Sequence, residues 1–177
     1  MRSTLKALIV KMEVILKLLK IGILTVVVMM MVSCSNEQLS LEERLVDELN
    51  SSDIYYDEII HYELKDDFVF VFYTVANNLF DVYLDLTSSN LEIIGGGGSL
   101  DEQGILITET DNLPYYFSYL ISNNPEVERV EVYGKPAKNI NSKGVSFWII
   151  FSEQPMEEED YTAYDHQGNQ VELIKKD

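Results

Sequence analysis

Residues 68–86 read FVFVFYTVANNLFDVYLDL, and this segment determines the fold class that the sequence predicts. Its first part, residues 68–75, is apolar almost throughout, which is typical of a central strand covered on both faces. In residues 79–86, apolar positions alternate with Asp81, Tyr83 and Asp85, which indicates one buried face and one solvent-exposed face. Because only a short Ala-Asn-Asn turn separates the two segments, we expect them to pair as antiparallel strands.

The flanking residues extend this pair into a four-stranded antiparallel meander. Residues 59–64 precede it and residues 91–94 follow it, each across a short polar turn. Residues 95–98 are four consecutive glycines, which stabilise neither a helix nor a strand well. We expect a mobile loop or an irregular strand end there. A phosphate-binding loop is disfavoured because no Lys-Ser/Thr pair and no helix start follow.

Two helices are predicted beside the strands. Residues 41–50 carry leucines at helical spacing, and Ser40 with Glu43 has the form of a capping box at their start. Residues 113–121, with Pro114 in the first turn, are expected to form a second, short helix whose aromatic face packs on a sheet.

The fold class predicted from these elements is α+β, with antiparallel β meanders covered by short helices. The first four strands are followed by a short strand or connector at residues 105–110 and, after the second helix, by a second series of four strands at residues 127–133, 145–151, 160–164 and 170–174. The hairpin at residues 83–94 aligns without gaps on residues 163–174, which suggests two similar helix-plus-four-strand halves, residues 39–98 and 112–175. The alternative is an all-β sandwich or small barrel.

The N-terminal region has the features of an export signal. Residues 1–20 contain five basic residues and one acidic residue, and residues 21–33 contain no charged residue. This uncharged run is shorter than the roughly 20 residues that a membrane-spanning helix needs. A cleaved signal peptide is therefore expected.

Met31-Val32-Ser33-Cys34, which ends this run, resembles the lipobox of bacterial lipoproteins. The resemblance covers the N-terminal segment alone. It implies cleavage after residues 1–33, a diacylglyceryl group on the Cys34 sulfur, and acylation, as by palmitate, of the new amino terminus. It also implies a protein held by lipid at the extracytoplasmic face of a bacterial cell membrane. Residues 34–38 are then a short spacer, and residues 39–177 a single acidic globular domain.

The charge of the remaining chain excludes several classes of partner. Residues 34–177 retain 8 of the 13 basic residues and 29 of the 30 acidic residues, a net charge near −21 with histidine neutral. Such a charge repels nucleic acids and anionic lipid headgroups, so we expect no nucleic-acid partner. Cys34 is the only cysteine, which excludes an intramolecular disulfide and a thiolate zinc site.

Residues suited to catalysis or metal binding are scarce. His61 and His166 are far apart in the sequence, and neither has the local spacing of a metal-binding motif. Residues 157–160 are the densest acidic run, but they lack the alternating ligands and the turn glycine of tight calcium loops. We interpret this run as a solvated strand edge. The sequence therefore predicts a non-enzymatic protein with no catalytic residues, no metal site and no cofactor.

Four aromatic residues form a candidate binding surface: Tyr115, Tyr116, Tyr119 and Trp148. Tyr and Trp are enriched at protein interfaces, although Trp148 lies in an apolar segment and is also expected in the core. The predicted function is a membrane-anchored protein-binding or adaptor module that contacts an envelope protein. The alternative is a lipoprotein receptor for a small ligand or a cation.

Overall fold

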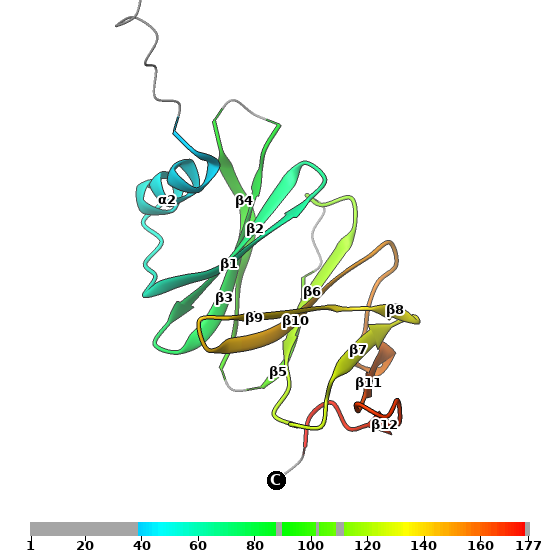
Figure 1. The fold of residues 1–177 in the computed structure, drawn as a ribbon. Coiled ribbons are helices and arrows are strands. Elements are labelled where there is room, and N and C mark those ends of the chain that lie inside the picture. Colours follow the sequence, from blue (N-terminus) through cyan, green and yellow to red (C-terminus); the bar gives the residue numbers. More distant parts are fainter. Residues whose placement is uncertain (1–38, 88–89, 102, 109–111, 176–177) are drawn as a thin grey trace, which may run out of the picture. The chain divides into compact units, whose positions relative to one another are not determined.

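Three four-stranded antiparallel sheets make up most of the domain (Figure 1). The computed structural model describes residues 39–87, 90–101, 103–108 and 112–175, so the predicted signal peptide and Cys34 lie outside the described residues. Sheet A has the strand order β1-β2-β3-β4, sheet B β5-β6-β10-β9, and sheet C β12-β11-β7-β8. The elements are α2 (Leu41–Ser51), β1 (Glu58–Lys65), β2 (Phe68–Val75), β3 (Asn78–Asp85), β4 (Glu92–Leu100), β5 (Gly104–Thr108), β6 (Tyr116–Ile121), β7 (Arg129–Val132), β8 (Lys135–Pro136), β9 (Lys138–Ser142), β10 (Val145–Ser152), the 3-10 helix η1 (Glu158–Asp160), β11 (Tyr161–Tyr164) and β12 (Gln170–Val171).

The elements of this domain pack in the order α2, sheet A, sheet B, sheet C. On β2, Val69 and Val71 pack in one cluster with Leu45 of α2, whereas Phe70 and Phe72 lie in the cluster shared with sheet B. This follows from the alternation of side chains along a strand. The prediction that residues 68–75 form a central strand with both faces covered is confirmed.

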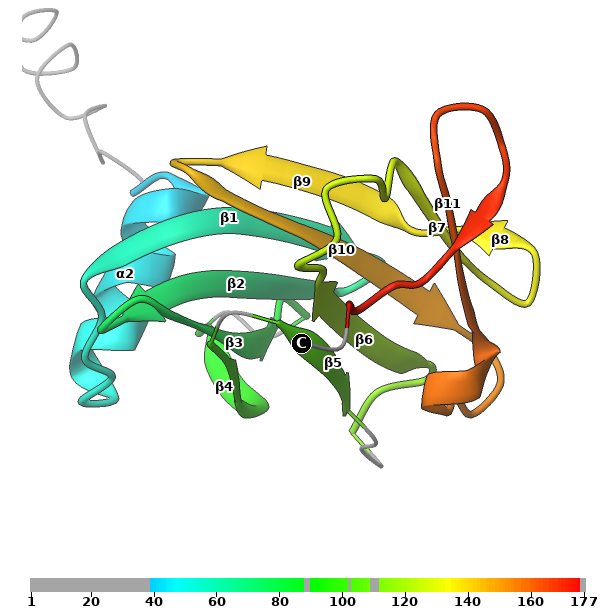
Figure 2. The ribbon, with the colours of Figure 1, turned by 90° about the horizontal axis from the view of Figure 1, so that it is seen from below.

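Sheet B is likewise covered on both faces. Phe117 of β6 packs in the cluster shared with sheet A, while Leu120 of β6 and Trp148 of β10 pack with residues of sheet C. The Tyr161 hydroxyl donates a hydrogen bond of 2.5 Å to the buried Ser118 hydroxyl oxygen and so joins sheet C to sheet B. Figure 2 shows β6 and β10 in sheet B, with β7, β8 and β11 of sheet C to one side.

The predicted α+β class is wrong, and the architecture is closer to the all-β alternative. The first helix and the meander are confirmed by α2 and by the order of β1 to β4, but residues 113–121 do not form a helix. Their C-terminal part is the strand β6, in which side chains on both faces are buried. In a strand, successive side chains point to opposite faces, so even a short segment can pack against a layer on each side. The two helix-plus-four-strand halves are also wrong, since residues 112–175 contain no described α-helix and divide their strands between sheets B and C.

The sequence predicts a mobile loop or an irregular strand end at the four glycines, but β4 continues through them to Leu100. The β3–β4 pairing contains two register shifts within this tract. A Cβ at Gly96 would lie 2.5 Å from the Asp81 carbonyl oxygen, and the φ of Gly96 is +125°. A Cβ at Gly95 or Gly98 would meet the side chains of Tyr83 and Leu106, respectively. The glycines are therefore required by close packing inside a bulged strand.

Candidate binding groove

The four aromatic residues predicted as one binding surface are divided between two clusters. Tyr119 has no exposed surface and packs between sheets A and B, with Tyr115 half-buried in the same cluster. Trp148 is 6% exposed and packs between sheets B and C, with Tyr116 at the margin of that second cluster. Sheet B lies between the two clusters, so these four side chains do not assemble into one surface.

A groove between α2 and β1 is a better candidate for a binding site. Its volume is about 330 Å³, and the half-buried or buried side chains of Val46, Tyr56, Ile59, Ile60 and Tyr62 line it. The exposed side chains of Glu42 and Lys143 also border it. Binding sites of this kind are mostly apolar concavities with a few polar groups at defined positions. The groove has this composition.

The charged groups that border the groove favour a cationic ligand. The Lys143 ammonium group is neutralised locally, since it donates a hydrogen bond of 2.7 Å to the Ile59 carbonyl oxygen and lies 3.1 Å from a Glu58 carboxylate oxygen. Burial raises the pKa of Tyr62, and the negative charge of Glu42 raises it further. Glu42 would therefore attract a cationic group that enters the groove, and Lys143 would repel it little because its charge is already paired.

The same lysine protects part of the exposed edge of sheet A. β1 is an edge strand, and edge strands present unpaired backbone groups to other chains. The Lys143 ammonium group donates a hydrogen bond to the Ile59 carbonyl oxygen, and the Ser142 hydroxyl donates one of 2.8 Å to the Ile60 carbonyl oxygen. Strand addition along this part of β1 is therefore blocked, and a ligand is expected to bind through side chains in the groove instead.

A second cleft of about 440 Å³ lies at one end of sheet A. Phe68, Ile93 and Ile94 contribute apolar surface, and Asp85 and Glu92, which are opposite each other in the β3–β4 ladder, contribute carboxylates. A side-chain hydrogen bond with Thr87 lowers the pKa of Asp85, and the Thr87 amide lowers it further, so this carboxylate stays ionised at neutral pH. The cleft is more polar than the groove at α2 and β1 and suits a small cationic ligand.

The histidines and the acidic run have structural contacts. His61 Nε2 lies 2.9 Å from a Glu63 carboxylate oxygen, which also receives the Lys138 ammonium group at 2.6 Å. In η1, Asp160 accepts hydrogen bonds from the Tyr133 hydroxyl and the Glu157 amide. Within the described ranges, no three His, Cys, Asp or Glu side chains are grouped as a metal ion would require.

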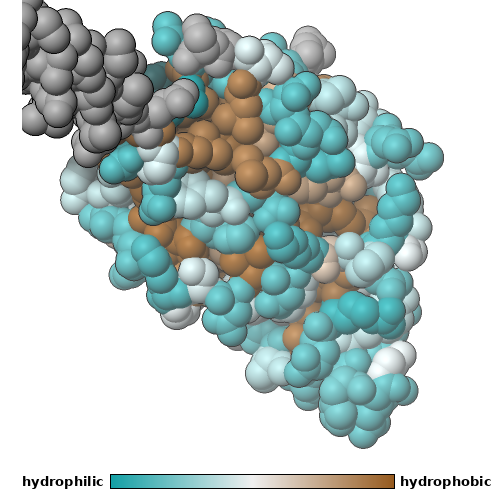
Figure 3. All heavy atoms as spheres, turned by 45° about the horizontal axis from the view of Figure 1, so that its top comes forward, coloured by the Kyte–Doolittle hydropathy of each residue, from teal (hydrophilic) through white to brown (hydrophobic). Residues whose placement is uncertain are grey.

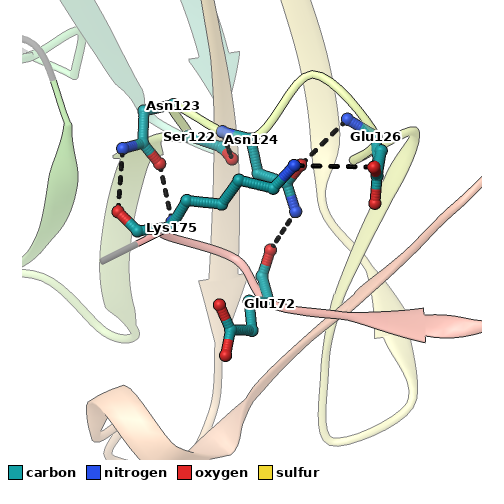
Figure 4. A network of polar contacts seen from close by, with 6 residues as sticks. All are labelled: Ser122, Asn123, Asn124, Glu126, Glu172 and Lys175. Atoms are coloured by element: carbon teal, nitrogen blue, oxygen red, sulfur yellow. Dashed lines mark hydrogen bonds and ion pairs between the residues drawn. The ribbon is translucent and has the colours of Figure 1, made fainter. Parts of the chain in front are cut away.

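The C-terminal residues are held by polar side chains rather than by a strand ladder (Figure 4). The Asn123 side chain donates a hydrogen bond to the Lys175 carbonyl oxygen and accepts one from the Lys175 amide, at 3.1 and 2.8 Å. The Asn124 side chain, in a residue that is 4% exposed, donates to the Glu172 carbonyl oxygen at 2.6 Å and accepts from the Glu126 amide at 3.1 Å.

Replacing Asn124 by alanine is expected to lower the free energy of unfolding by about 1–3 kcal/mol, because two backbone groups lose buried partners. Asn123→Ala is the matched control, since Asn123 also bonds the C-terminal backbone but is exposed. It is expected to cost about 1 kcal/mol or less. Urea denaturation of both variants checks the prediction, and equal losses would contradict it.

Comparison with known proteins adds no identification: no family model, curated protein or solved structure matches the chain. Among the described residues, no helix is long and apolar enough to cross a membrane.

The sequence did contain a signal for the groove, because Glu42 and Val46 are four residues apart and so share one face of a helix. Their position beside β1 depends on how α2 packs on sheet A, which sequence periodicity does not determine.

Proposed function

We propose that this protein is a bacterial lipoprotein, held by acyl chains on Cys34 at the extracytoplasmic face of the cell membrane, and that it acts as a non-enzymatic protein-binding module. Its partner is a polypeptide segment that places an apolar side chain in the groove between α2 and β1 and a Lys or Arg side chain beside Glu42. The observation that carries this proposal is the groove itself, with its apolar floor and its locally neutralised lysine.

Charge supports a basic partner. The whole chain has a formal net charge of −17, and complementary charge raises the rate of encounter with a basic segment. The size of the groove supports a side-chain anchor, because about 330 Å³ lies at the lower end of the range of about 300–1,000 Å³ for ligand sites. Six residues lie between Cys34 and the first residue of α2, so the link between the lipid-bearing residue and the domain is short.

Lipid attachment is tested by replacing Cys34 with alanine. Cells that express the wild-type protein and are fed labelled palmitate should yield a labelled protein in the membrane fraction. The Cys34→Ala variant should carry no label and should leave the membrane fraction on washing, since the thiol that receives the diacylglyceryl group is absent. A labelled Cys34→Ala variant would contradict the anchoring proposal, whatever the groove binds.

The groove is tested by selecting displayed peptides on the full-length protein in detergent. We expect the selected peptides to combine Lys or Arg with a neighbouring aliphatic or aromatic residue and to bind more weakly as salt increases. Glu42→Lys should reduce their affinity about tenfold or more, because it places a positive charge at the rim. Binding is measured by isothermal titration calorimetry.

Glu92→Lys is the matched control, because it makes the same change of charge at another exposed glutamate, on β4. It should leave the affinity within about twofold of wild type, a difference below about 0.5 kcal/mol. Selected peptides that are acidic, or whose binding falls equally in both variants, would contradict the groove as the site.

The second candidate is a receptor for a small cationic ligand in the cleft that contains Asp85 and Glu92. The specific observation in its favour is the pair of carboxylates in one cleft with Phe68, because carboxylates and aromatic rings both attract cations. Calcium chloride and a diamine are suitable probes. An increase in melting temperature that is lost in Asp85→Asn and Glu92→Gln, with no peptide bound at the groove, would favour this second function.

A further inference from the structure

Asp81 of β3 is a buried acid that neither proposed site uses. Strand alternation predicts Asp81 on a solvent-exposed face, yet the residue has no exposed surface. Its sequence neighbours at the i±2 positions, Leu79 and Tyr83, pack in the cluster between sheets A and B, so its side chain lies on that interior face. Neither carboxyl oxygen has a hydrogen-bond partner among the described protein groups. An ionised carboxylate in such a place is strongly disfavoured.

The groups that act on this carboxyl do not compensate a negative charge. Burial raises the pKa of Asp81 to about 7, and the nearby Tyr119 hydroxyl and Gly98 amide offset only part of this effect without reaching hydrogen-bonding geometry. The Tyr119 hydroxyl bonds instead to the Leu79 carbonyl oxygen, at 3.5 Å. Among the described residues, the titratable groups whose pKa values Asp81 affects are Tyr119 of β6, on the same face of sheet A, and Tyr73 of β2, on the opposite face; both pKa values are raised by burial and then by Asp81. No basic group is among them.

The strand opposite Asp81 is an irregular edge strand. β4 is an edge strand of sheet A, and its ladder with β3 shifts register between Phe80 and Val82, at Asp81 itself, and again between Tyr83 and Leu84. Bulges interrupt the regular hydrogen bonding of a ladder. Glycines provide no side chains to hold this part of β4 against its neighbours. The buried acid therefore lies where the β3–β4 ladder is irregular.

We propose that the contact between β3 and β4 at Asp81 is a pH-dependent device: β4 is closed on β3 while the Asp81 carboxyl is protonated, and loss of that proton releases the glycine tract. Release of β4 hydrates the carboxylate and uncovers part of the aromatic interior between sheets A and B. The device is independent of the groove between α2 and β1, because none of its residues lines that groove.

Hydrogen–deuterium exchange of the full-length protein tests this proposal. Amide protection is compared at pH 5.5 and pH 8.5 after correction for the intrinsic exchange rates. If Asp81 regains its ordinary pKa of 3.8 when β4 is released, the population of the released state should rise about thirtyfold between these pH values. Protection of peptides from β4 should fall by this factor, whereas peptides from β7 and β11 of sheet C should change much less.

Two variants make the test specific. Asp81→Asn has no proton to lose, so its β4 peptides should keep the same protection at both pH values. Asp67→Asn changes an exposed carboxylate in the turn between β1 and β2 of the same sheet and should behave as wild type. The proposal is overturned if Asp81→Asn retains the wild-type pH dependence, or if β4 and sheet C lose protection equally. Should Asp81→Asn fail to fold, the carboxyl carbon of Asp81 in the wild-type protein is titrated by NMR, and a midpoint near 4 overturns the proposal.

Discussion

Gly96→Ala is expected to lower the free energy of unfolding by at least about 3 kcal/mol. The same substitution should disrupt the pairing of β4 with β3 at the edge of sheet A. The new Cβ would lie 2.5 Å from the Asp81 carbonyl oxygen and 2.5 Å from the Val82 Cα atom. Both are backbone atoms of the neighbouring strand, so no side-chain rotation relieves the clash. The φ of +125° adds strain, because L residues other than glycine rarely adopt it. Guanidinium denaturation measures the loss.

Gly144→Ala is the matched control for this prediction. Gly144 has a φ of +81°, and no atom lies within 4 Å of the position that its Cβ would take. It isolates the cost of a positive φ, which is about 1–2 kcal/mol. A loss in Gly96→Ala no larger than in Gly144→Ala would show that the close approach of β4 to β3 is not a constraint in solution.

Asp81→Asn is expected to stabilise the protein at pH 8 by up to about 4 kcal/mol, since a pKa difference of about three units corresponds to that energy. The folded-state pKa of Asp81, about 7, lies above the ordinary value of 3.8. Between pH 3.8 and pH 7 the Asp81 carboxyl is therefore protonated in the folded protein but ionised in the unfolded chain. The contribution of Asp81 to stability therefore falls as pH rises from about 4 to about 7 and is constant above that range.

Denaturation of wild type and Asp81→Asn across pH 4 to 8 checks this prediction. The difference between the two curves isolates Asp81 from the other carboxylates. Asp57 and Asp165, for example, have pKa values lowered chiefly by hydrogen bonds, to the Ala76 amide and the Asn169 side chain respectively, and they produce the opposite trend. The two proteins should be nearly equal in stability at pH 4 and diverge up to pH 7. A constant difference over the whole range would contradict the prediction.

Local periodicity predicted those elements whose burial matches their sequence pattern. The helix at residues 41–50 and the strand at residues 68–75 were predicted correctly because α2 has one buried face and β2 has two. The prediction for residues 113–121 was wrong because Pro114 suits a first helical turn and an aromatic run has no clear period. Packing between two sheets decides that segment, and a single sequence does not show that both neighbouring layers exist.

Asp81 shows why the interior was harder to predict than the strands. Alternation assigned its face correctly as the face opposite Phe80 and Val82, but that face is covered by sheet B rather than by water. The groove depends similarly on long-range packing, because it joins α2 and β1 to Lys143 in the turn between β9 and β10. Residues so far apart in sequence come together only through the topology, which local patterns do not encode.

The attachment of residues 172–175 through Asn123 and Asn124 couples two segments that lie far apart in the sequence (Figure 4). Figure 3 shows hydrophobic residues at the surface of the folded domain bordered by hydrophilic ones, and detachment of residues 172–175 would expose more, because Leu173 packs against the cluster between sheets B and C. The acceptors of the two asparagine side chains are the carbonyl oxygens of Lys175 and Glu172, which lie outside every described strand. The β6–β7 connection and residues 172–175 therefore depend on each other, so local opening of either segment is expected to release the other and to expose both to proteases.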